Sequence, residues 1–200
     1  CQRQKFGADT LIRIPDNWSF AEAATALVYQ TAWRAIFEPL QPTTDSLARH
    51  PKLPADAVIA VTGASGGVGL AAVQIGLSLG AQVVALSRSE SSRERLRNVG
   101  AQHVFSPEQA DLKKAVFASI GRKGVDAVVE TVGGPMLGLG VHLLGYGGRV
   151  GVVGVLAGVE GSVPIPSLMF KRASVHGIQV GEIDPSESVM ELSQIVEHLE

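Results

Sequence analysis

A glycine-rich segment that directly follows an apolar run has the residue types and spacing of a phosphate-binding loop. The apolar run at residues 57–61 leads into Thr62-Gly63-Ala64-Ser65-Gly66-Gly67-Val68-Gly69, and a helix is predicted over residues 70–79. Gly63 and Gly66 allow a tight turn, and the bare backbone at 66–67 lets a pyrophosphate approach. Gly69 lets the helix pack closely on the strand, and the helix N-terminus offers unpaired N–H groups and a positive dipole end. The predicted phosphate contacts are Ser65, Gly66, Gly67, Val68 and Gly69.

The surroundings of this loop separate it from other glycine motifs. A bare glycine triplet is a weak signal, but the strand–loop–helix setting is the one that a dinucleotide-binding loop requires. The alternative is a structural turn that binds nothing. No Lys-Ser/Thr pair follows the glycines, so the segment is not a Walker loop. It also fits the T-G-x-x-x-G-x-G pattern of short-chain dehydrogenases, which need a Tyr and a Lys four residues later. Trp33 and Val150 stand four residues after Tyr29 and Tyr146, so that chemistry is absent.

The end of the second predicted strand carries a candidate selector for the cofactor. Ser87 lies 21 residues after Gly66, where a fold that prefers NAD usually has an acid to bind the ribose 2′-hydroxyl. Here Ser87 is followed by Arg88 and a second serine, and a guanidinium with two hydroxyls suits a 2′-phosphate. Glu90 is close and opposes this interpretation, Arg93 is a second candidate, and the alternative is a solvated loop with an ordinary arginine. Ser87 and Arg88 are predicted to favour NADP(H) over NAD(H).

Short β-branched runs alternate with helix-length segments along most of the chain. The predicted strands cover residues 57–61, 82–86, 103–105, 126–129, 149–153 and 175–180. The first, second and fifth runs are apolar almost throughout, as expected of parallel strands covered on both faces. Strands that alternate with helices predict an α/β fold with a doubly wound parallel sheet.

The segments outside this alternation carry their own signals. Residues 11–14 form a short strand-like run, and Ser19 with Glu22 forms a capping-box pattern before a helix to about residue 37. The apolar stripe of that helix is Phe20, Ala23, Ala24, Leu27, Val28 and Ile36. Residues 41–56 contain three prolines and form a predicted linker loop. Residues 184–187 are a further N-cap signature, and the amphipathic helix that follows reaches the end of the chain.

The composition excludes several classes of protein. The chain is 46% hydrophobic and has 23 glycines, which suits a globular domain with tight turns or close approach to a ligand. A net charge of -2, without a block of like charges, does not indicate a surface that binds nucleic acid or a membrane. The single Cys1 excludes an internal disulfide and a cysteine-rich metal cluster. No signal peptide or transmembrane run is recognisable, so a cytoplasmic location is expected. A chain that opens at cysteine is expected to be a piece of something longer.

Several residue runs occur in order along nearly all 200 residues and together resemble one superfamily. They lie at residues 11–16, 23–27, 31–33, 64–69, 99–101, 124–130, 147–150 and 171–177. These runs resemble the medium-chain dehydrogenase/reductase superfamily, and within it the quinone oxidoreductase and related alcohol-dehydrogenase-like branches. The chain departs from the pattern in its longer loop at 41–54 and in Ala55-Asp56, where a Gly-Asp pair is common.

The resemblance implies a Rossmann fold and a division of roles among its strand ends. Residues 1–18 would be a short remnant of a GroES-like catalytic domain, and residues 19–200 the NAD(P)-binding domain. Thr31 would lie against the nicotinamide ring. The adenine and ribose would be flanked by Thr131, Val132 and Gly133, unless this is a plain strand-to-helix turn. The carboxamide would meet backbone groups of Val153, Gly154, Gly177, Ile178 and Val180, unless these strand ends only pack.

The resemblance also implies that no zinc is bound. In metal-dependent relatives one ligand is a Cys four residues before the threonine that matches Thr31. That position is Leu27, which belongs to the predicted apolar stripe and is expected in the core. The histidines are scattered, without the spacing of a closed zinc site. They are His50, His103, His142, His176 and His198. Cys1 is expected to be inert.

The function implied is an NAD(P)H-dependent oxidoreductase that transfers a hydride between the nicotinamide and a carbonyl, quinone or enone. The catalytic groups would lie mainly on the GroES-like domain, so no general acid is predicted here, and the chain alone is expected to bind cofactor without turnover. A quinone or enone reductase is not separated from an alcohol dehydrogenase. The alternative is a non-catalytic NADPH-binding module, a sensor or an assembly partner. The expected partners are a small-molecule substrate and a second copy in a homodimer, not nucleic acid or a membrane.

Overall fold

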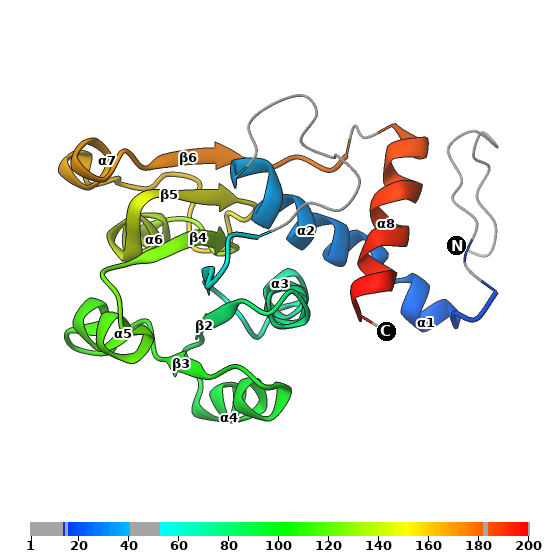
Figure 1. The fold of residues 1–200 in the computed structure, drawn as a ribbon, viewed down its shortest axis with the longest axis horizontal. Coiled ribbons are helices and arrows are strands. Elements are labelled where there is room, and N and C mark those ends of the chain that lie inside the picture. The colour runs from blue at the N-terminus through cyan, green and yellow to red at the C-terminus, as the bar shows by residue number, and fades with distance from the viewer. Residues whose placement is uncertain (1–13, 15, 41–52, 182–183, 200) are drawn as a thin grey trace.

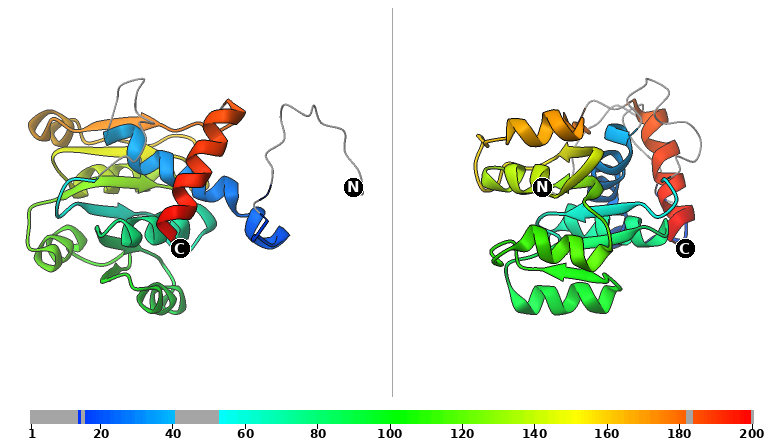
Figure 2. Two further views of the ribbon diagram at one scale, coloured as in Figure 1. Left: turned by 45° about the vertical axis from the view of Figure 1, so that its right-hand side comes forward. Right: turned by 60° about the vertical axis from the view of Figure 1, so that its left-hand side comes forward.

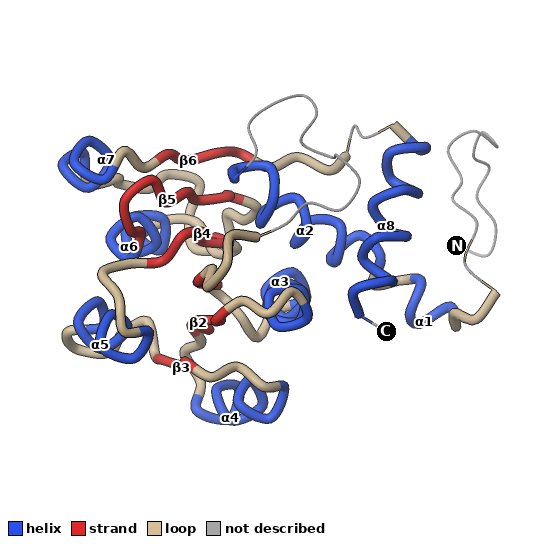
Figure 3. The backbone as a smooth tube through the Cα atoms, viewed as in Figure 1, coloured by secondary structure: helices blue, strands red, loops and turns tan. Residues whose placement is uncertain are grey.

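The computed structural model describes residues 14, 16–40, 53–181 and 184–199, and it centres on one six-stranded sheet (Figures 1 and 3). The strands are β1 (Val58–Val61), β2 (Gln82–Leu86), β3 (His103–Phe105), β4 (Val125–Glu130), β5 (Leu144–Val152) and β6 (Ser174–Gly177). Their order is β3-β2-β1-β4-β5-β6, and all pairings are parallel. The strand order reverses between β1 and β4, which is the Rossmann arrangement, so the predicted doubly wound sheet is confirmed.

Helices cover both faces of this sheet, as Figures 1 and 2 show. They are α1 (Phe20–Ala23), α2 (Ala26–Leu40), α3 (Gly67–Ser78), α4 (Glu90–Val99), α5 (Leu112–Ile120), α6 (Pro135–Leu143), α7 (Ile165–Lys171) and α8 (Pro185–Leu199). Residues of α2, α3, α4 and α8 form one core with one side of the strands. Residues of α5, α6 and α7 form a second core with the other side.

The central strand β1 alternates its side chains between these two cores. Ile59 and Val61 pack in the core under α2 and α3, while Val58 and Ala60 pack in the core under α5 and α6. All four residues are fully buried, which explains why this strand is an uninterrupted apolar run. The glycine loop therefore emerges from a strand that is buried between the two cores.

Helix α8 docks on α2 through a buried charged cluster that the sequence did not reveal. Arg34 Nη1 lies 2.8 Å from Glu38 Oε1, and its Nη2 lies 2.7 Å from Glu187 Oε1. Glu191 Oε2 accepts hydrogen bonds from Arg34 Nε at 3.1 Å and from Gln30 Nε2 at 2.7 Å. Glu191 Oε1 lies 2.8 Å from Arg34 Nη2 without the alignment of a hydrogen bond, and no other described donor reaches it. Three carboxylates thus share one guanidinium.

The helix expected from residue 19 to about 37 is two helices with a turn between them. The capping box is confirmed, because Glu22 N–H donates to Ser19 Oγ at 3.2 Å and Ser19 N–H donates to Glu22 Oε2 at 2.7 Å. The predicted apolar stripe was largely wrong: Phe20 is 87% exposed and Leu27 is 60% exposed. The reason is that α1 and the start of α2 extend past the sheet (Figure 1). The apolar residues of α2 that reach the core are Ala32, Trp33, Ala35, Ile36 and Phe37.

Other boundaries differ by a few residues from the predicted ones. Helix α3 begins at Gly67 rather than residue 70, β5 begins at Leu144, and β6 ends at Gly177 rather than residue 180. The strand expected at 11–14, the remnant expected at 1–18 and the linker expected at 41–56 lie largely outside the described residues. Within the described ranges, no helix is long and apolar enough to span a bilayer.

Candidate functional site

The loop after β1 approaches its neighbours so closely that two of its glycines have no room for a side chain. Gly63 has a φ of +57°, and a Cβ there would lie 2.5 Å from Thr131 Oγ1. A Cβ on Gly69 would overlap the Gly63 carbonyl oxygen and lie 2.8 Å from Ala64 Cα. As the sequence predicted, the bare backbone at Gly69 allows α3 to start directly against the end of the strand.

The N-terminus of α3 is open to a ligand. Its N-cap is Gly66, which has no side chain to satisfy the first turn. The N–H groups at residues 67–69 have no acceptor within the helix, because the four-residue helical hydrogen bond cannot reach them. Residues 65–67 are exposed. Gly66 has a φ of -80°, which any residue adopts, so the tight turn depends on Gly63 and not on Gly66 as expected. This helix end is suited to an anion such as a phosphate.

The loop after β2 lies beside the glycine loop. Ser87 is 5% exposed, and its Oγ lies 3.1 Å from Ser65 Oγ. Arg88 is exposed, and no hydrogen bond or ion pair holds its side chain within the described part of the chain. The structure therefore brings together Ser65 and Ser87 and leaves the side chain of the next residue, Arg88, exposed.

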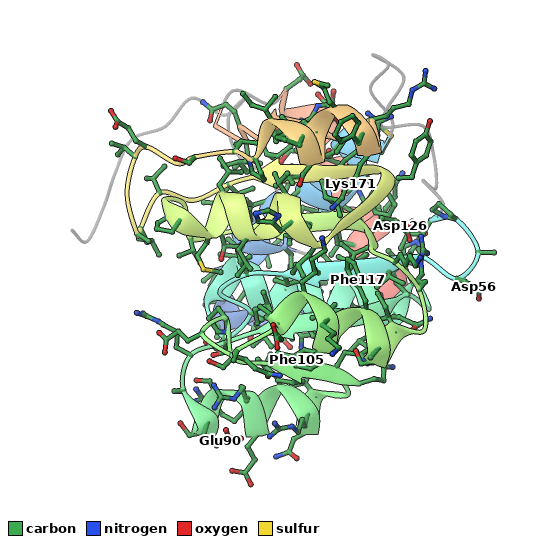
Figure 4. All side chains as sticks on the ribbon, turned by 90° about the vertical axis from the view of Figure 1, so that its left-hand side faces the viewer. Asp56, Glu90, Phe105, Phe117, Asp126 and Lys171 are labelled. Atoms are coloured by element: carbon green, nitrogen blue, oxygen red, sulfur yellow. The ribbon has the colours of Figure 1, made fainter. Side chains whose placement is uncertain are left out.

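The two residues that complicated the prediction, Glu90 and Arg93, are paired with each other. Arg93 Nη2 lies 2.5 Å from Glu90 Oε2, and Arg97 Nη1 lies 3.1 Å from Glu90 Oε1. Arg93 Nη1 also donates to the carbonyl oxygens of Ser87 and Arg88, at 2.8 and 2.5 Å. The hydrogen bond from Arg93, and then that from Arg97, lowers the pKa of Glu90. Arg93 thus shapes the loop rather than pointing at a ligand. Figure 4 shows Glu90 on the opposite side of the molecule from Asp56 and Asp126.

The turn after β4 uses its polar groups internally. The N–H groups of Val132 and Gly133 donate to the Glu130 carboxylate at 2.9 and 2.8 Å. Thr131 Oγ1 donates to the Thr62 carbonyl oxygen at 2.7 Å. Sequence reasoning missed Glu130 as a site residue, although a carboxylate at the end of an otherwise apolar strand was a usable signal. The turn therefore presents little beyond the Val132 side chain for contact with a ligand.

The end of β5 lies next to this turn, and the end of β6 lies next to that of β5. Val153 N–H donates to the Glu130 carbonyl oxygen at 2.9 Å, and Gly154 is packed so closely that a Cβ would overlap the Thr131 carbonyl. Ile178 N–H donates to the Val152 carbonyl oxygen at 3.0 Å. Nothing lies within 4 Å of a Cβ placed on Gly177. The turn at 131–133 lies between these strand ends and the glycine loop. Val180 lies three residues beyond β6 and is half-buried.

Helix α2 runs past the glycine loop toward β5. A Cβ on Gly67 would meet Val28 Cγ1 at 3.4 Å, and a Cβ on Gly151 would meet the Ala35 carbonyl oxygen at 2.5 Å. Thr31 lies between these two contact points on the same helix and is half-buried. Its Oγ1 donates to the Leu27 carbonyl oxygen at 2.7 Å, so the hydroxyl is used within the helix.

The described residues contain no cluster of three or more His, Cys, Asp or Glu side chains that could hold a metal ion. His142 is exposed, His176 Nε2 lies 2.7 Å from Ser174 Oγ, and His198 stacks on Trp33. Cys1 and His50 lie outside the described residues. A groove of about 260 Å³ lies between α1, the start of α2, and α8. None of the predicted cofactor contacts lines this groove.

Comparison with known proteins gives the family. A family model described as "Zinc-binding dehydrogenase" matches residues 67–197, from the glycine loop to the last helix. Quinone oxidoreductase from Mus musculus is 32% identical over 182 residues, which cover 90% of this chain and 51% of the relative. The chain thus spans about half the length of this curated relative.

Solved structures agree with this assignment. YhdH from E. coli K-12 with bound NADPH is 27% identical with a TM-score of 0.71, and the match covers 96% of this chain and 56% of that one. The Bacillus subtilis protein yhfP with NAD bound is 25% identical with a TM-score of 0.76, over the same shares. The chain belongs to the zinc-binding dehydrogenase family, within the medium-chain dehydrogenase/reductase superfamily that its motifs resemble.

Proposed function

We propose that this chain is the cofactor-binding part of an NADP(H)-dependent oxidoreductase that transfers a hydride between a nicotinamide and a carbonyl, quinone or enone. The observation that carries the proposal is the meeting of the glycine loop, Ser87, the 131–133 turn and the ends of β5 and β6 at one edge of the sheet. Ligands of open α/β sheets bind at this edge, where the strand order reverses. The relation to mouse quinone oxidoreductase supports the reaction class.

The groups present fit a dinucleotide. The uncapped N-terminus of α3, with residues 65–69, would hold the pyrophosphate through N–H groups. The side chain of Val132 would form the wall against adenine and ribose, since the N–H groups of Thr131, Val132 and Gly133 are already bonded. Thr31 and the strand-end residues would flank the nicotinamide. These strand-end residues are Val153, Gly154, Gly177, Ile178 and Val180.

The preference for NADP(H) rests on the loop after β2. Arg88 is exposed and unpaired among the described residues, whereas the neighbouring Glu90 is paired with Arg93 and Arg97. An anionic 2′-phosphate would therefore meet a free guanidinium and a carboxylate whose charge is largely compensated. YhdH was solved with NADPH and yhfP with NAD, so relatives of this fold bind either form, and this loop would decide for this chain.

A bound nicotinamide would carry the hydride, and the residues of this chain would hold and orient the ring. No residue is assigned as a general acid. The whole enzyme would use a GroES-like domain, of which residues 1–18 would be a remnant, with residues 19–200 as the NAD(P)-binding domain. The chain alone would then bind cofactor without significant turnover, because hydride transfer needs reacting carbons held about 3–3.5 Å apart in a site without water. Zinc would play no part, because Leu27 offers no donor atom.

A homodimer and a cytoplasmic location complete the proposal. Strand β6 pairs on one side only in the part of the chain that the structure describes. Apolar side chains are exposed beside it, on β6, on α7 and in the loop after β5. They are Leu156, Val159, Ile165, Met169, Phe170 and Val175. Pairing of two such edges would bury these side chains and complete the hydrogen bonding of β6.

The test is a calorimetric titration of the 200-residue chain with NADPH, followed by incubation of the mixture with a panel of quinones and enones. The chain is expected to bind NADPH with negligible turnover. In a sedimentation measurement it should behave as a dimer. A chain that binds no nicotinamide cofactor would contradict the proposed function. Robust turnover would show that the catalytic groups lie within these residues.

A further inference from the structure

Glu130 is a fully buried carboxylate at the end of β4, and it has no ion-pair partner among the described residues. Its Oε1 accepts hydrogen bonds from Val132 N–H at 2.9 Å and from Thr62 Oγ1 at 2.9 Å. Its Oε2 accepts a hydrogen bond from Gly133 N–H at 2.8 Å. A buried ionisable group is costly unless its hydrogen bonds are satisfied, and here three donors converge on it.

The two amide contacts need an acceptor at both oxygens. A carboxylate offers acceptor oxygens on both sides, whereas a glutamine of the same shape has an NH₂ group in one position. An amide NH₂ cannot accept from a backbone N–H, so one of Val132 and Gly133 would be left unsatisfied in a glutamine variant. The turn at 131–133 therefore depends on the carboxylate of Glu130 and not only on its size.

Thr62 carries this anchoring to the glycine loop. Thr62 Oγ1 accepts from Thr131 N–H at 3.0 Å while it donates to Glu130. The Thr131 hydroxyl returns a hydrogen bond to the Thr62 carbonyl oxygen. Gly63, the next residue, leaves only the space of a hydrogen atom beside Thr131 Oγ1. The position of the first turn of the glycine loop is thus set by the turn after β4.

The loop after β5 is attached to the same turn. Val153 N–H donates to the backbone carbonyl of Glu130 at 2.9 Å, and Ala157 N–H donates to the Val132 carbonyl at 2.7 Å. Gly133 lies so near this loop that a Cβ would be 2.8 Å from the Gly154 carbonyl oxygen. Glu130 therefore stands where three strand-end loops, 62–66, 131–134 and 153–158, are joined.

We propose that Glu130 is a positioning residue for the cofactor site: without contacting the cofactor, its carboxylate holds these three loops in one arrangement. The inference rests on the proposed function, because the arrangement matters for affinity only if the cofactor binds across these loops. Two measurements separate them, one made without cofactor and one made with it.

The first measurement compares amide ¹⁵N–¹H spectra of the chain with those of Glu130→Gln, both without cofactor. The cross-peaks of Gly63, Gly133 and Gly154 should all move. Those of Gly80 and Gly121, whose surroundings are open within 4 Å, should not. Movement of the Gly133 peak alone would overturn the proposal, because it would show that the three loops are not joined through Glu130.

The second measurement is the Kd for NADPH. Glu130→Gln and Thr62→Val should each weaken binding about tenfold, which corresponds to about 1.4 kcal/mol. Thr62→Ser should bind NADPH as tightly as the wild type, because it keeps the hydroxyl. Val116→Ala, in the core under α5, is the matched control. It should lower the melting temperature without changing the Kd.

Unchanged affinity in Glu130→Gln would overturn the inference while leaving the proposed function standing. An equal loss in Val116→Ala would also overturn it, since the effect would then be one of general stability. If Glu130→Gln does not fold, Thr62→Val with Thr62→Ser decides in the same way. A wild-type chain that fails to bind NADPH would overturn the proposed function and the claim about affinity, and the first measurement would still decide whether Glu130 joins the loops.

Discussion

The hydroxyl oxygens of Ser65 and Ser87 lie 3.1 Å apart although the two residues are 22 positions apart in the chain. They come from the loops after β1 and β2, whose parallel pairing places Val61 beside Ala85. Either hydroxyl can donate, so the pair closes the space between the two loops without adding charge. An acid at position 87 would instead place a negative charge beside the N-terminus of α3, where we propose that the phosphate binds. The neutral pair is therefore compatible with a phosphorylated cofactor.

We expect Arg88→Ala to weaken NADPH binding roughly ten- to a hundred-fold, because a charge-assisted contact is worth about 1.5–3 kcal/mol. The affinity for NADH should stay as it is, since NADH has no 2′-phosphate. Calorimetric titration with both cofactors measures the change. Lys114→Ala, which removes the same charge from an exposed position on α5, is the control. Equal affinities of the wild-type chain for the two cofactors would contradict the assignment.

Substitutions of Gly66 and Gly69, at the start of α3, should separate an effect on cofactor binding from an effect on stability. Gly66→Ala should cost less than about 1 kcal/mol of the free energy of unfolding, since its φ is ordinary and its Cβ would meet only the Gly63 carbonyl oxygen, at 3.4 Å. It should nevertheless weaken cofactor binding by crowding the phosphate. Gly69→Ala should cost about 2 kcal/mol or more, because its Cβ would overlap backbone. Urea denaturation and calorimetry together test the pair, and similar stabilities would be the contrary result.

The attachment of α8 to α2 should weaken as the pH rises. Burial raises the pKa of Glu191 above its ordinary value of 4.5, against the opposing hydrogen bonds from Gln30 and Arg34. A group with a raised pKa in the folded state stabilises most below its unfolded pKa, and this contribution is lost as the pH rises through the folded value.

Glu191→Gln should therefore gain in free energy of unfolding relative to the wild type as the pH is raised from about 4.5 to about 8. Urea denaturation at a series of pH values measures the difference. The control is Glu197→Gln, an exposed position on the same helix, which should follow the wild type. A constant difference between Glu191→Gln and the wild type would contradict the raised pKa.

We expect the chain to hold no stoichiometric zinc when it is purified without chelator. Leu27 has no donor atom, and no group of three candidate ligands is found among the described residues. Elemental analysis by mass spectrometry gives the zinc content per chain. One zinc per chain that resists dialysis and is lost on mutation of a nearby ligand would show that the match of Leu27 to the family's cysteine is wrong.

Local patterns in the sequence were enough to predict the sheet. Strands β2 and β3 begin and end at the predicted residues. In β2, residues 83–86 are fully buried, and such a parallel strand leaves an uninterrupted apolar run. The glycine loop could also be predicted from local features. Gly63 has a φ of +57°, which favours glycine, and a Cβ on Gly69 would overlap the nearby backbone of Gly63. The end of β6 was less clear, because residues 178–180 continue the apolar pattern after the pairing with β5 has ended.

Contacts between residues far apart in the chain could not be predicted from the sequence. The stripe from Phe20 to Leu27 looked like a core face, but its burial depends on what lies beside it, and the sheet does not extend that far. Arg34 and Glu191 are ordinary helix-surface residues by type, and only the docking of α8 makes them partners. Glu130 is joined to the glycine loop in the same way, through a hydrogen bond from Thr62, which is distant in the chain.

The bond between Thr62 and Glu130 joins residues 68 positions apart in the chain. During synthesis, the glycine loop and α3 leave the ribosome well before β4, and the turn that fixes the loop follows only with the residues just after Glu130. Contacts of such sequence separation close late, since the chain between them must be ordered first. A nascent chain that ends before β4 would therefore contain the complete glycine motif and still lack the proposed cofactor site, which would form only once the second half of the sheet has assembled.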